Sequence, residues 1–553
     1  MVNSIADIIY AHGVRDVVVS PGSRNAPLID SFASHEEFKT KVIVDERTAA
    51  FVALGISLAT DRPVALVCTS GSAVLNYAPA VAEAFYRQVP LIVISADRPA
   101  QWIDQNDSQT IKQPRVLSNI VKTSVDIPAD ISTETDAWWS NRLLNDSMLT
   151  ALEENRGPVH INVQISAEQL AGKTGVGNSR IISSTKPTPI VDDKMFDRLK
   201  SGSPRKIIIV GGFAKNNPLL EKSLSLLAEK ENIVVLTESI CNIRHDKFIS
   251  AIDRTLSAIT PEIEADICPE VVISFGGALV TRMLKQRLRL LKNVEHWHVG
   301  IQNMSIDCFT SLSQRIETPA DVFFASMAKA LPDCKSDFSR SWHILSDKAA
   351  KSHNTYVDSV EWSDMTAYKY IFGNLPSNID LHLSNGTPIR YAQLFANATT
   401  PHSFCNRGVS GIEGSTSTAI GMSMASNSPT MLISGDLSAF YDLSAFAIEG
   451  IGGNMKIVVM MNGGGSIFRF VKATRNRPTL DRYMAANPRF PIAKIADAFG
   501  FDYHECNSLD SIRYEWNSFV TENDKPAILA IFTDPIISTE ILDNYFKFIS
   551  ANG

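Results

Sequence analysis

Short runs of apolar residues alternate along the chain with longer stretches of helical periodicity. In the first part of the chain, these runs cover residues 16–19, 42–44, 64–67, 91–94 and 159–163, and each of the first four ends in polar or glycine-rich residues. Uninterrupted apolar runs of this length are typical of strands buried on both faces of a parallel sheet. Their alternation with helices predicts βαβ units whose functional side chains follow the carboxyl ends of the strands.

The same rhythm returns twice further along the chain. The second set of runs covers 207–212, 233–236, 271–274 and 296–299, and the third covers 381–384, 430–433, 457–461 and 527–532. Residues 171–189 are rich in Gly, Ser, Thr, Lys and Pro without periodicity, which is typical of a linker. We therefore predict an α/β protein with three open parallel-sheet domains, at residues 1–180, 190–335 and 355–553.

Length and composition agree with this interpretation. A chain of 553 residues is too long for one hydrophobic core. Its 44% hydrophobic and 20% charged residues are ordinary for a globular protein. The formal net charge of −7 argues against nucleic acid as the main partner.

The sequence also indicates the cellular compartment of the protein. The first residues lack the basic and apolar regions of a signal peptide, and no apolar run reaches the ~18 residues of a membrane span. The seven cysteines are scattered and form no Cys-x-x-Cys pair, which favours buried thiols over disulfides or zinc. We expect a cytoplasmic protein without a membrane span.

The richest chemical pattern follows the two central runs of the third domain. Residues 430–433 lead into Ser434, Gly435 and Asp436, whereas 457–461 lead into Asn462 and three glycines. Carboxylate and amide oxygens suit a hard cation such as Mg²⁺, which keeps water and phosphate oxygens as its other ligands. Consecutive glycines let the backbone approach a diphosphate and offer it amide donors. The alternative is a pair of ordinary turns, because Gly-Asp and Asn-Gly are common turn dipeptides.

Glu46 is a second candidate, at the end of the apolar run 42–44 and just before the helical stretch 49–55. A partly desolvated carboxylate at this position could share a proton with a ligand nitrogen. The alternative is an acid in the first turn that stabilises the helix dipole. The residues alone leave both interpretations open.

Together, Glu46 and the 435–465 pattern resemble the two halves of the site in thiamine diphosphate-dependent enzymes. An ordered set of further motifs spans nearly the whole chain: 18–25, 45–47, 69–73, 95–99, 106–109, 406–412 and 435–442. This set closely resembles the family of 2-succinyl-5-enolpyruvyl-6-hydroxy-3-cyclohexene-1-carboxylate synthases of menaquinone biosynthesis. Any one of these motifs alone would be weak.

The resemblance implies thiamine diphosphate as the cofactor, with Mg²⁺ as the metal and Mn²⁺ as an alternative. Asp436 and Asn462 would bind the metal through their side chains, and Gly464 would bind it through its carbonyl. Glu46 would be catalytic, because a glutamate of this family holds N1′ of the aminopyrimidine and favours the imino form that activates the cofactor. The other implied cofactor contacts are Thr69, Gly411, Ile412, Gly435, Leu437, Ser438, Gly465, Ile467 and Phe468. Among these, Ile412 would support the bent cofactor.

The resemblance also implies a transferase that decarboxylates 2-oxoglutarate and adds the succinyl carbanion to isochorismate. Both substrates keep carboxylates, which arginine binds through two donors while remaining charged when desolvated. The implied substrate contacts are Ser23, Arg24, Arg98, Gln109, Arg282, Arg390 and Arg407. Sites shared between subunits would require a homodimer or homotetramer.

Three departures from the family pattern leave details open. Gly386 stands where the family commonly has a serine, so Ser384 or Thr387 would have to supply the hydroxyl. The family pattern has a lysine in the central domain, and the equivalent residue of this chain is either Arg282 or Lys285. The metal loop reads Met461-Asn462-Gly463 and lacks one neighbouring polar group.

Other functions also fit parts of the pattern. Another thiamine diphosphate-dependent 2-oxoacid decarboxylase or carboligase is the first alternative. A non-catalytic thiamine-binding scaffold is the second, although it would have no need of a partner for the N1′ proton. No Gly-x-Gly-x-x-Gly follows a strand in the central domain, so we predict no bound flavin there.

Overall fold

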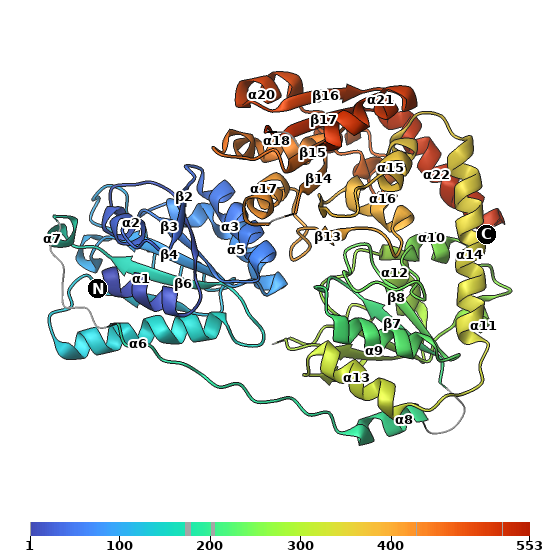
Figure 1. The fold of residues 1–553 in the computed structure, drawn as a ribbon, viewed down its shortest axis with the longest axis horizontal. Coiled ribbons are helices and arrows are strands. Elements are labelled where there is room, and N and C mark those ends of the chain that lie inside the picture. The colour runs from blue at the N-terminus through green and yellow to red at the C-terminus, as the bar shows by residue number, and fades with distance from the viewer. Residues whose placement is uncertain are drawn as a thin grey trace.

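The computed structural model describes residues 2–171, 179–200, 205–302, 304–426, 428–521 and 524–552, which form three sheets with helices packed around them (Figure 1). The strand orders are β2-β1-β3-β4-β6-β5, β11-β10-β9-β7-β8 and β13-β12-β14-β15-β17-β16. All their pairings are parallel. The predicted fold class, three open parallel-sheet α/β domains, is confirmed.

The N-terminal sheet has a fully buried centre, because β1, β3, β4 and β6 carry apolar residues on both faces. Its strands are β1 (Asp16–Val19), β2 (Lys39–Val42), β3 (Val64–Cys68), β4 (Leu91–Asp97), β5 (Ser124–Ile127) and β6 (Val159–Gln164). Its helices are α1 (Val2–Ala11), α2 (Ala26–Ala33), α3 (Glu46–Thr60), α4 (Ala73–Asn76), α5 (Ala78–Arg87), α6 (Glu134–Ala151) and α7 (Ala167–Leu170), with the 3₁₀ turn η1 (Ala100–Trp102).

The central sheet follows a segment, residues 179–192, that forms no helix or strand and overlaps the predicted linker. The remaining linker residues 172–178 lie outside the described ranges. The strands are β7 (Ile207–Gly211), β8 (Ile233–Thr237), β9 (Val271–Phe275), β10 (Glu295–Val299) and β11 (Leu312–Ile316). The helices are η2 (Asp193–Phe196), α8 (Asp197–Lys200), α9 (Pro218–Ala228), α10 (Ile252–Ser257), α11 (Glu264–Ile267), α12 (Arg282–Leu290) and α13 (Ala320–Ala330).

The C-terminal sheet is preceded by the long helix α14 (Phe338–Ser359). Its strands are β12 (Asp380–Leu383), β13 (His402–Phe404), β14 (Thr430–Gly435), β15 (Met455–Met461), β16 (Asp502–Cys506) and β17 (Ala527–Phe532). Its helices are α15 (Asp364–Gly373), α16 (Thr387–Phe395), α17 (Ser415–Ala425), α18 (Asp436–Tyr441), η3 (Leu443–Ala447), α19 (Ile467–Phe470), η4 (Leu480–Ala485), α20 (Ile492–Phe499), α21 (Leu509–Val520) and α22 (Pro535–Asn552).

One predicted strand is wrong. Residues 42–44 were expected to form a buried strand, but β2 is the more polar segment Lys39–Val42 at the edge of the sheet. Val42 and Val44 are 67% and 75% exposed. Only Ile43 of this run is buried, so the apolar residues face outward on either side of it.

The central and C-terminal domains share one hydrophobic core. A single cluster of buried apolar side chains continues from Val272 of β9 through Trp342 of α14 to Val458 of β15. The helix α14 runs along both domains (Figure 1). Its Trp342 donates to the carbonyl of Ile267 at 3.1 Å, and its Tyr356 donates to the carbonyl of Ile541 at 2.7 Å.

The N-terminal and C-terminal domains meet where α3 crosses α17. A Cβ atom on Gly55 would lie 2.0 Å from the carbonyl oxygen of Thr418, and one on Gly421 would lie 2.2 Å from that of Val52. Glycine at these two positions therefore permits the backbones of the two helices to touch.

We expect Gly55→Ala to destabilise the protein by about 1–3 kcal/mol or more, because a methyl group must push two buried helix backbones apart. Chemical denaturation compared with the wild type measures this loss. Gly373→Ala is the matched control, because a Cβ built on Gly373 has no atom within 4 Å. Equal stability of the two variants would contradict the close packing of α3 against α17.

Among the described residues, no helix combines the length and the apolar character that crossing a bilayer requires.

Candidate active site

The predicted metal ligands lie side by side at the carboxyl edge of the C-terminal sheet. β14 and β15 are neighbours, with Gly435 paired to Met460, so Asp436 and Asn462 follow adjacent strand ends. The Asp436 carboxylate accepts hydrogen bonds from the amides of Gly463 (3.0 Å) and Gly464 (2.9 Å). Burial raises the pKa of Asp436 above its usual value, while these amide donors oppose the shift.

Asp364 orients Asn462. The Asn462 Nδ2 donates to Asp364 Oδ2 at 2.9 Å, and the Thr533 hydroxyl donates to the other carboxylate oxygen at 2.5 Å. Because its NH₂ group is committed to Asp364, the oxygen of the Asn462 amide is the atom available to a cation. Burial raises the pKa of Asp364 to about 6. The sequence does not predict this residue, since the first acid of a helix carries no signal that it contacts a residue 98 positions away.

The glycine run forms a cradle that no larger residue could form. Gly464 has a φ of +95°, and a Cβ there would lie 2.2 Å from the carbonyl oxygen of Ala485. A Cβ on Gly465 would lie 2.7 Å from the ring of Phe468. By contrast, open space surrounds the Cβ position of Gly435. A carboxylate, an amide oxygen and closely approachable backbone fit a divalent cation that carries a diphosphate.

The loop before α17 is tied to this edge. The Ser438 hydroxyl of α18 donates to the carbonyl of Ile412 at 2.5 Å. Asn385 Nδ2 donates to the carbonyl of Gly411 at 2.7 Å. The structure therefore brings four of the predicted cofactor contacts, Gly411, Ile412, Leu437 and Ser438, to the Asp436 region.

Beside this edge, a cavity of about 790 Å³ lies between the central and C-terminal domains. Arg282 and Asp253 of the central domain line it, together with Thr387, Arg390 and Ile467. Burial lowers the pKa of Arg390, and the nearby cations Arg407 and Arg282 lower it further. Three of the predicted substrate arginines therefore share one electrostatic environment.

The cavity bears on two choices that the sequence left open. Arg282 lines it, whereas Lys285 donates to the carbonyl of Leu279 at 2.9 Å and lines a separate pocket. Thr387 also lines it, whereas the Ser384 hydroxyl is buried and accepts from the amide of Gly435 at 3.3 Å. Arg282 and Thr387 are therefore better placed than their alternatives to contact a molecule bound in this cavity.

Glu238 is a further carboxylate that was not predictable from the sequence. It is fully buried and accepts from the amides of Val280 (2.7 Å) and Thr281 (2.6 Å), directly before α12. It thereby fixes the start of the helix that carries Arg282. Burial raises the pKa of Glu238 from its usual 4.5 to about 7, against the effect of the two amide donors.

This shift predicts a pH effect on stability. Because the folded chain binds the Glu238 proton more tightly than the unfolded chain, the stabilisation from this group is present below pH 4.5 and disappears as the pH rises to 7. We expect Glu238→Gln to gain stability relative to the wild type across this window, by up to about 3 kcal/mol.

Urea denaturation at several pH values between 4.5 and 8 measures the difference. Glu270→Gln controls for the loss of a carboxylate, since exposed Glu270 also accepts a backbone amide, from Lys206 at 2.9 Å. A pH-independent difference between Glu238→Gln and the wild type would contradict the raised pKa.

The predicted residues of the N-terminal domain follow its strand ends. A Cβ on Gly22 would lie 2.3 Å from Thr69, whose hydroxyl is buried without a partner among the described residues. Arg98 pairs with Asp107, and Arg24 donates to the carbonyl of Ile165 at 3.0 Å. Ser23 and Gln109 are exposed.

The loop that follows this edge has an unusual backbone. Four residues other than glycine adopt positive φ angles between β4 and β5: Asp104, Asn106, Gln109 and Arg115. Such conformations are uncommon and concentrate at functional sites. Within the described residues of one chain, no hydrogen bond or ion pair joins Ser23, Arg24, Arg98 or Gln109 to the arginines of the 790 Å³ cavity.

Glu46 is the first residue of α3, after the N-cap Asp45, whose side chain accepts from the Thr48 amide at 3.2 Å. Its neighbours reach the segment that follows Asp436. The Ser444 hydroxyl donates to Asp45 at 2.6 Å, and Arg47 donates to the carbonyl of Tyr441 at 3.1 Å. Glu46 itself is half-buried and accepts from Asn76 Nδ2 at 3.5 Å.

Comparison with known proteins adds independent information. Residues 1–116 match the family model described as "Thiamine pyrophosphate enzyme, N-terminal TPP binding domain". Three curated relatives are named 2-succinyl-5-enolpyruvyl-6-hydroxy-3-cyclohexene-1-carboxylate synthase. The relative from Porphyromonas gingivalis is 38% identical, over 100% of this chain and 97% of its own length. Those from Flavobacterium johnsoniae and Bacteroides fragilis are each 37% identical, over 99% and 98% of this chain and 98% and 97% of their own lengths.

Proposed function

The chain belongs to the family of 2-succinyl-5-enolpyruvyl-6-hydroxy-3-cyclohexene-1-carboxylate synthases, and we propose that it decarboxylates 2-oxoglutarate and transfers the succinyl unit to isochorismate. This step belongs to menaquinone biosynthesis. The observation that carries the proposal is the position of the arginine-lined cavity next to the Asp436 edge. The Asp436 edge is suited to a metal-bound diphosphate, and the cavity is suited to carboxylates.

Thiamine diphosphate is the cofactor of this enzyme family, and when bound it supplies the electron sink that decarboxylation requires. Asp436, Asn462 and the carbonyl of Gly464 would hold Mg²⁺, or Mn²⁺ in its place. The glycine run would let the backbone approach the diphosphate closely. Ile412 and the Phe468 ring would supply the apolar surfaces around the cofactor.

Glu46 would hold and return a proton at N1′ of the aminopyrimidine. Exposed apolar side chains belong to the segments that contact Glu46 and its chain neighbours: Val44, Leu75, Tyr441 and Leu443 are 75%, 44%, 48% and 37% exposed. Exposed apolar groups around a half-buried acid support a C2 homodimer, or a tetramer built from it, in which a second copy covers Glu46. The shared site would then combine the predicted site residues of the N-terminal domain of one subunit with the cavity of the other subunit.

The substrate carboxylates would bind to guanidinium groups in this shared site. Arg282 and Arg390 line the cavity, and Arg407 lies close enough to Arg390 to lower its pKa. Arg24 and Arg98 would contribute from the partner subunit. Ser23, Gln109 and Thr387 would orient the substrates through neutral hydrogen bonds. Fixed arginines bind carboxylates without transferring protons, because guanidinium groups remain protonated.

An assay of isochorismate consumption tests the proposal. The ultraviolet absorbance of isochorismate should fall only when 2-oxoglutarate, thiamine diphosphate and Mg²⁺ are all present. Turnover of 2-oxoglutarate without isochorismate would instead favour another 2-oxoacid decarboxylase or carboligase. Cofactor binding without turnover of either substrate would favour the non-catalytic scaffold.

A further inference from the structure

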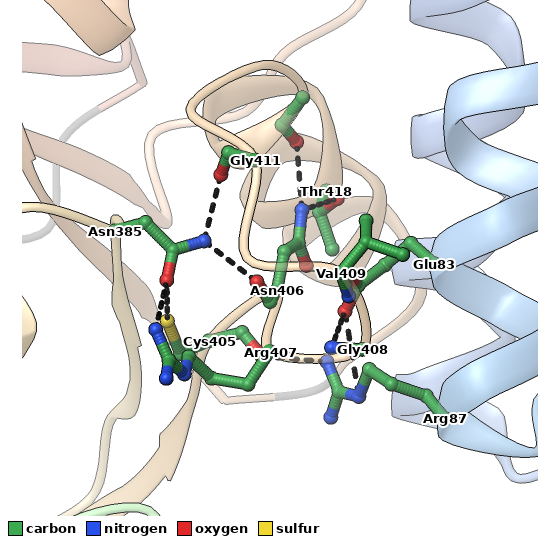
Figure 2. A network of polar contacts seen from close by, with 11 residues as sticks. Glu83, Arg87, Asn385, Cys405, Asn406, Arg407, Gly408, Val409, Gly411 and Thr418 are labelled. Atoms are coloured by element: carbon green, nitrogen blue, oxygen red, sulfur yellow. Dashed lines mark hydrogen bonds and ion pairs between the residues drawn. The ribbon is translucent and has the colours of Figure 1, made fainter. Parts of the chain in front are cut away.

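A buried polar network joins the N-terminal domain to the C-terminal domain next to the residues assigned above to Mg²⁺ and the cofactor. Figure 2 shows Glu83 and Arg87 on α5, facing a loop of the C-terminal domain. This loop, residues 405–412, connects β13 to α17 and is called here the Arg407 loop. It carries both Arg407 and Ile412. Its position therefore determines where the proposed substrate-binding arginine and the proposed support of the cofactor lie.

Glu83 grips the backbone of the Arg407 loop. Its side chain is 1% exposed, and its two carboxylate oxygens accept separately from the amides of Gly408 and Val409, both at 2.8 Å. A Cβ on Gly408 would lie 2.6 Å from the carbonyl oxygen of Glu83, so only glycine permits this approach. The next residue but one, Ser410, has a φ of +65°, a strained conformation that the surroundings must maintain.

Arg87 supplies the counter-charge. Its Nε lies 4.0 Å from Glu83 Oε1, and its NH1 donates to the carbonyl of Cys405 at 2.9 Å. The guanidinium also stacks over the ring of Phe213 in the central domain, 4.3 Å from the ring centroid. The Glu83–Arg87 pair therefore lies at the junction of all three domains.

Asn385 holds the other side of the same loop. Its Nδ2 donates to the carbonyls of Asn406 (2.6 Å) and Gly411 (2.7 Å), and its Oδ1 accepts from Arg407 NH1 at 3.0 Å. All four polar positions of the Asn385 amide are thus aimed at the Arg407 loop, including the Cys405 thiol. The loop is pinned between its own domain and α5.

We propose that Glu83 is a positioning residue that fixes the Arg407 loop, through the amides of Gly408 and Val409, for the reaction at the adjacent site. The kinetic part of this proposal rests on the proposed function of Arg407. The hydrogen bonds from the Gly408 and Val409 amides to Glu83, called here the Glu83 clamp, exist in the protein without ligands. The clamp and its kinetic effect can therefore be tested separately.

Glu83→Gln is the direct test. The variant is nearly isosteric, but its amide keeps one acceptor oxygen and turns an NH₂ donor toward one of the two amide donors. We expect hydrogen exchange of residues 405–412 to rise about tenfold in the ligand-free protein, while exchange in β7 and β9 stays unchanged. We also expect the KM for 2-oxoglutarate to rise about tenfold, with a smaller change in kcat.

A double-mutant cycle separates positioning from a general loss of stability. If Glu83 acts through Arg407, Glu83→Gln should add less than about twofold to the KM effect of Arg407→Lys, because coupled residues give non-additive effects.

Glu295→Gln is the matched control, since Glu295 also pairs with an arginine, Arg205 at 2.8 Å, but lies within the central domain. Glu83→Asp, which retains the charge beside Arg87, is a second test variant. We expect it too to raise hydrogen exchange of residues 405–412 and the KM for 2-oxoglutarate.

Each outcome bears on one part of the proposal. Unchanged exchange of the Arg407 loop in both Glu83 variants would overturn the clamp. Additive effects of Glu83→Gln and Arg407→Lys on KM would overturn the positioning role. Wild-type kinetics of Arg407→Lys would instead refute the substrate role of Arg407, and the exchange result would still decide the clamp.

Discussion

Replacing Glu46 by Gln is expected to leave binding of thiamine diphosphate largely intact and to lower turnover by about 10²–10⁴-fold, the usual contribution of a positioned general acid–base. The amide keeps the size and a hydrogen bond of the carboxylate but cannot exchange a proton with N1′. Calorimetric titration of the cofactor and the isochorismate assay measure the two quantities separately.

Glu134→Gln is the matched control for this prediction. Glu134 is the first residue of α6, as Glu46 is of α3, and it is exposed. If Glu46 only stabilised a helix dipole, both variants would lose about 0.3–1 kcal/mol of stability and retain their activity. Wild-type turnover of Glu46→Gln would therefore exclude the catalytic role.

Asp436→Ala is expected to abolish Mg²⁺-dependent retention of the cofactor. Loss of an outer-shell partner alone costs about 10–100-fold in metal affinity, so loss of a direct ligand should cost at least about 100-fold. The substitution also removes the acceptor of the Gly463 and Gly464 amides, which shapes the cradle. The thermal stabilisation that saturating cofactor confers on the wild type should disappear in this variant.

The control for Asp436→Ala is Asp510→Ala, because Asp510 is an exposed carboxylate of the same domain, with its side chain 92% accessible. This variant should bind the cofactor like the wild type, with the same dependence on Mg²⁺. If Asp436→Ala also bound the cofactor with an unchanged Mg²⁺ requirement, the metal site would lie elsewhere.

The central strands were predictable from sequence, and most edge strands were not. Strands such as β14 and β15 are buried on both faces and therefore carry continuous apolar runs. The missed strands, β5, β11, β13 and β16, all lie at sheet edges, where one face is partly exposed. Asp502–Cys506, for example, contains Asp, His and Glu, so its composition gave no strand signal.

The candidate site divides in the same way. Asp436 and Asn462 could be paired from sequence because each follows an apolar run, and adjacent parallel strands bring such positions together. Asp364, Glu238 and Glu83 could not be predicted, because their partners are polar side chains or backbone N–H groups of distant segments. Backbone donors leave no trace in composition or spacing, so only the tertiary structure identifies such contacts.

The continuous core between the central and C-terminal domains has a consequence for how the protein can come apart. Since α14 contributes Trp342 and Tyr356 to packing in both domains, neither half can melt without exposing apolar surface of the other. The two should behave as one cooperative folding unit, and an evolutionary exchange of the central domain alone would require a new interface along the whole helix.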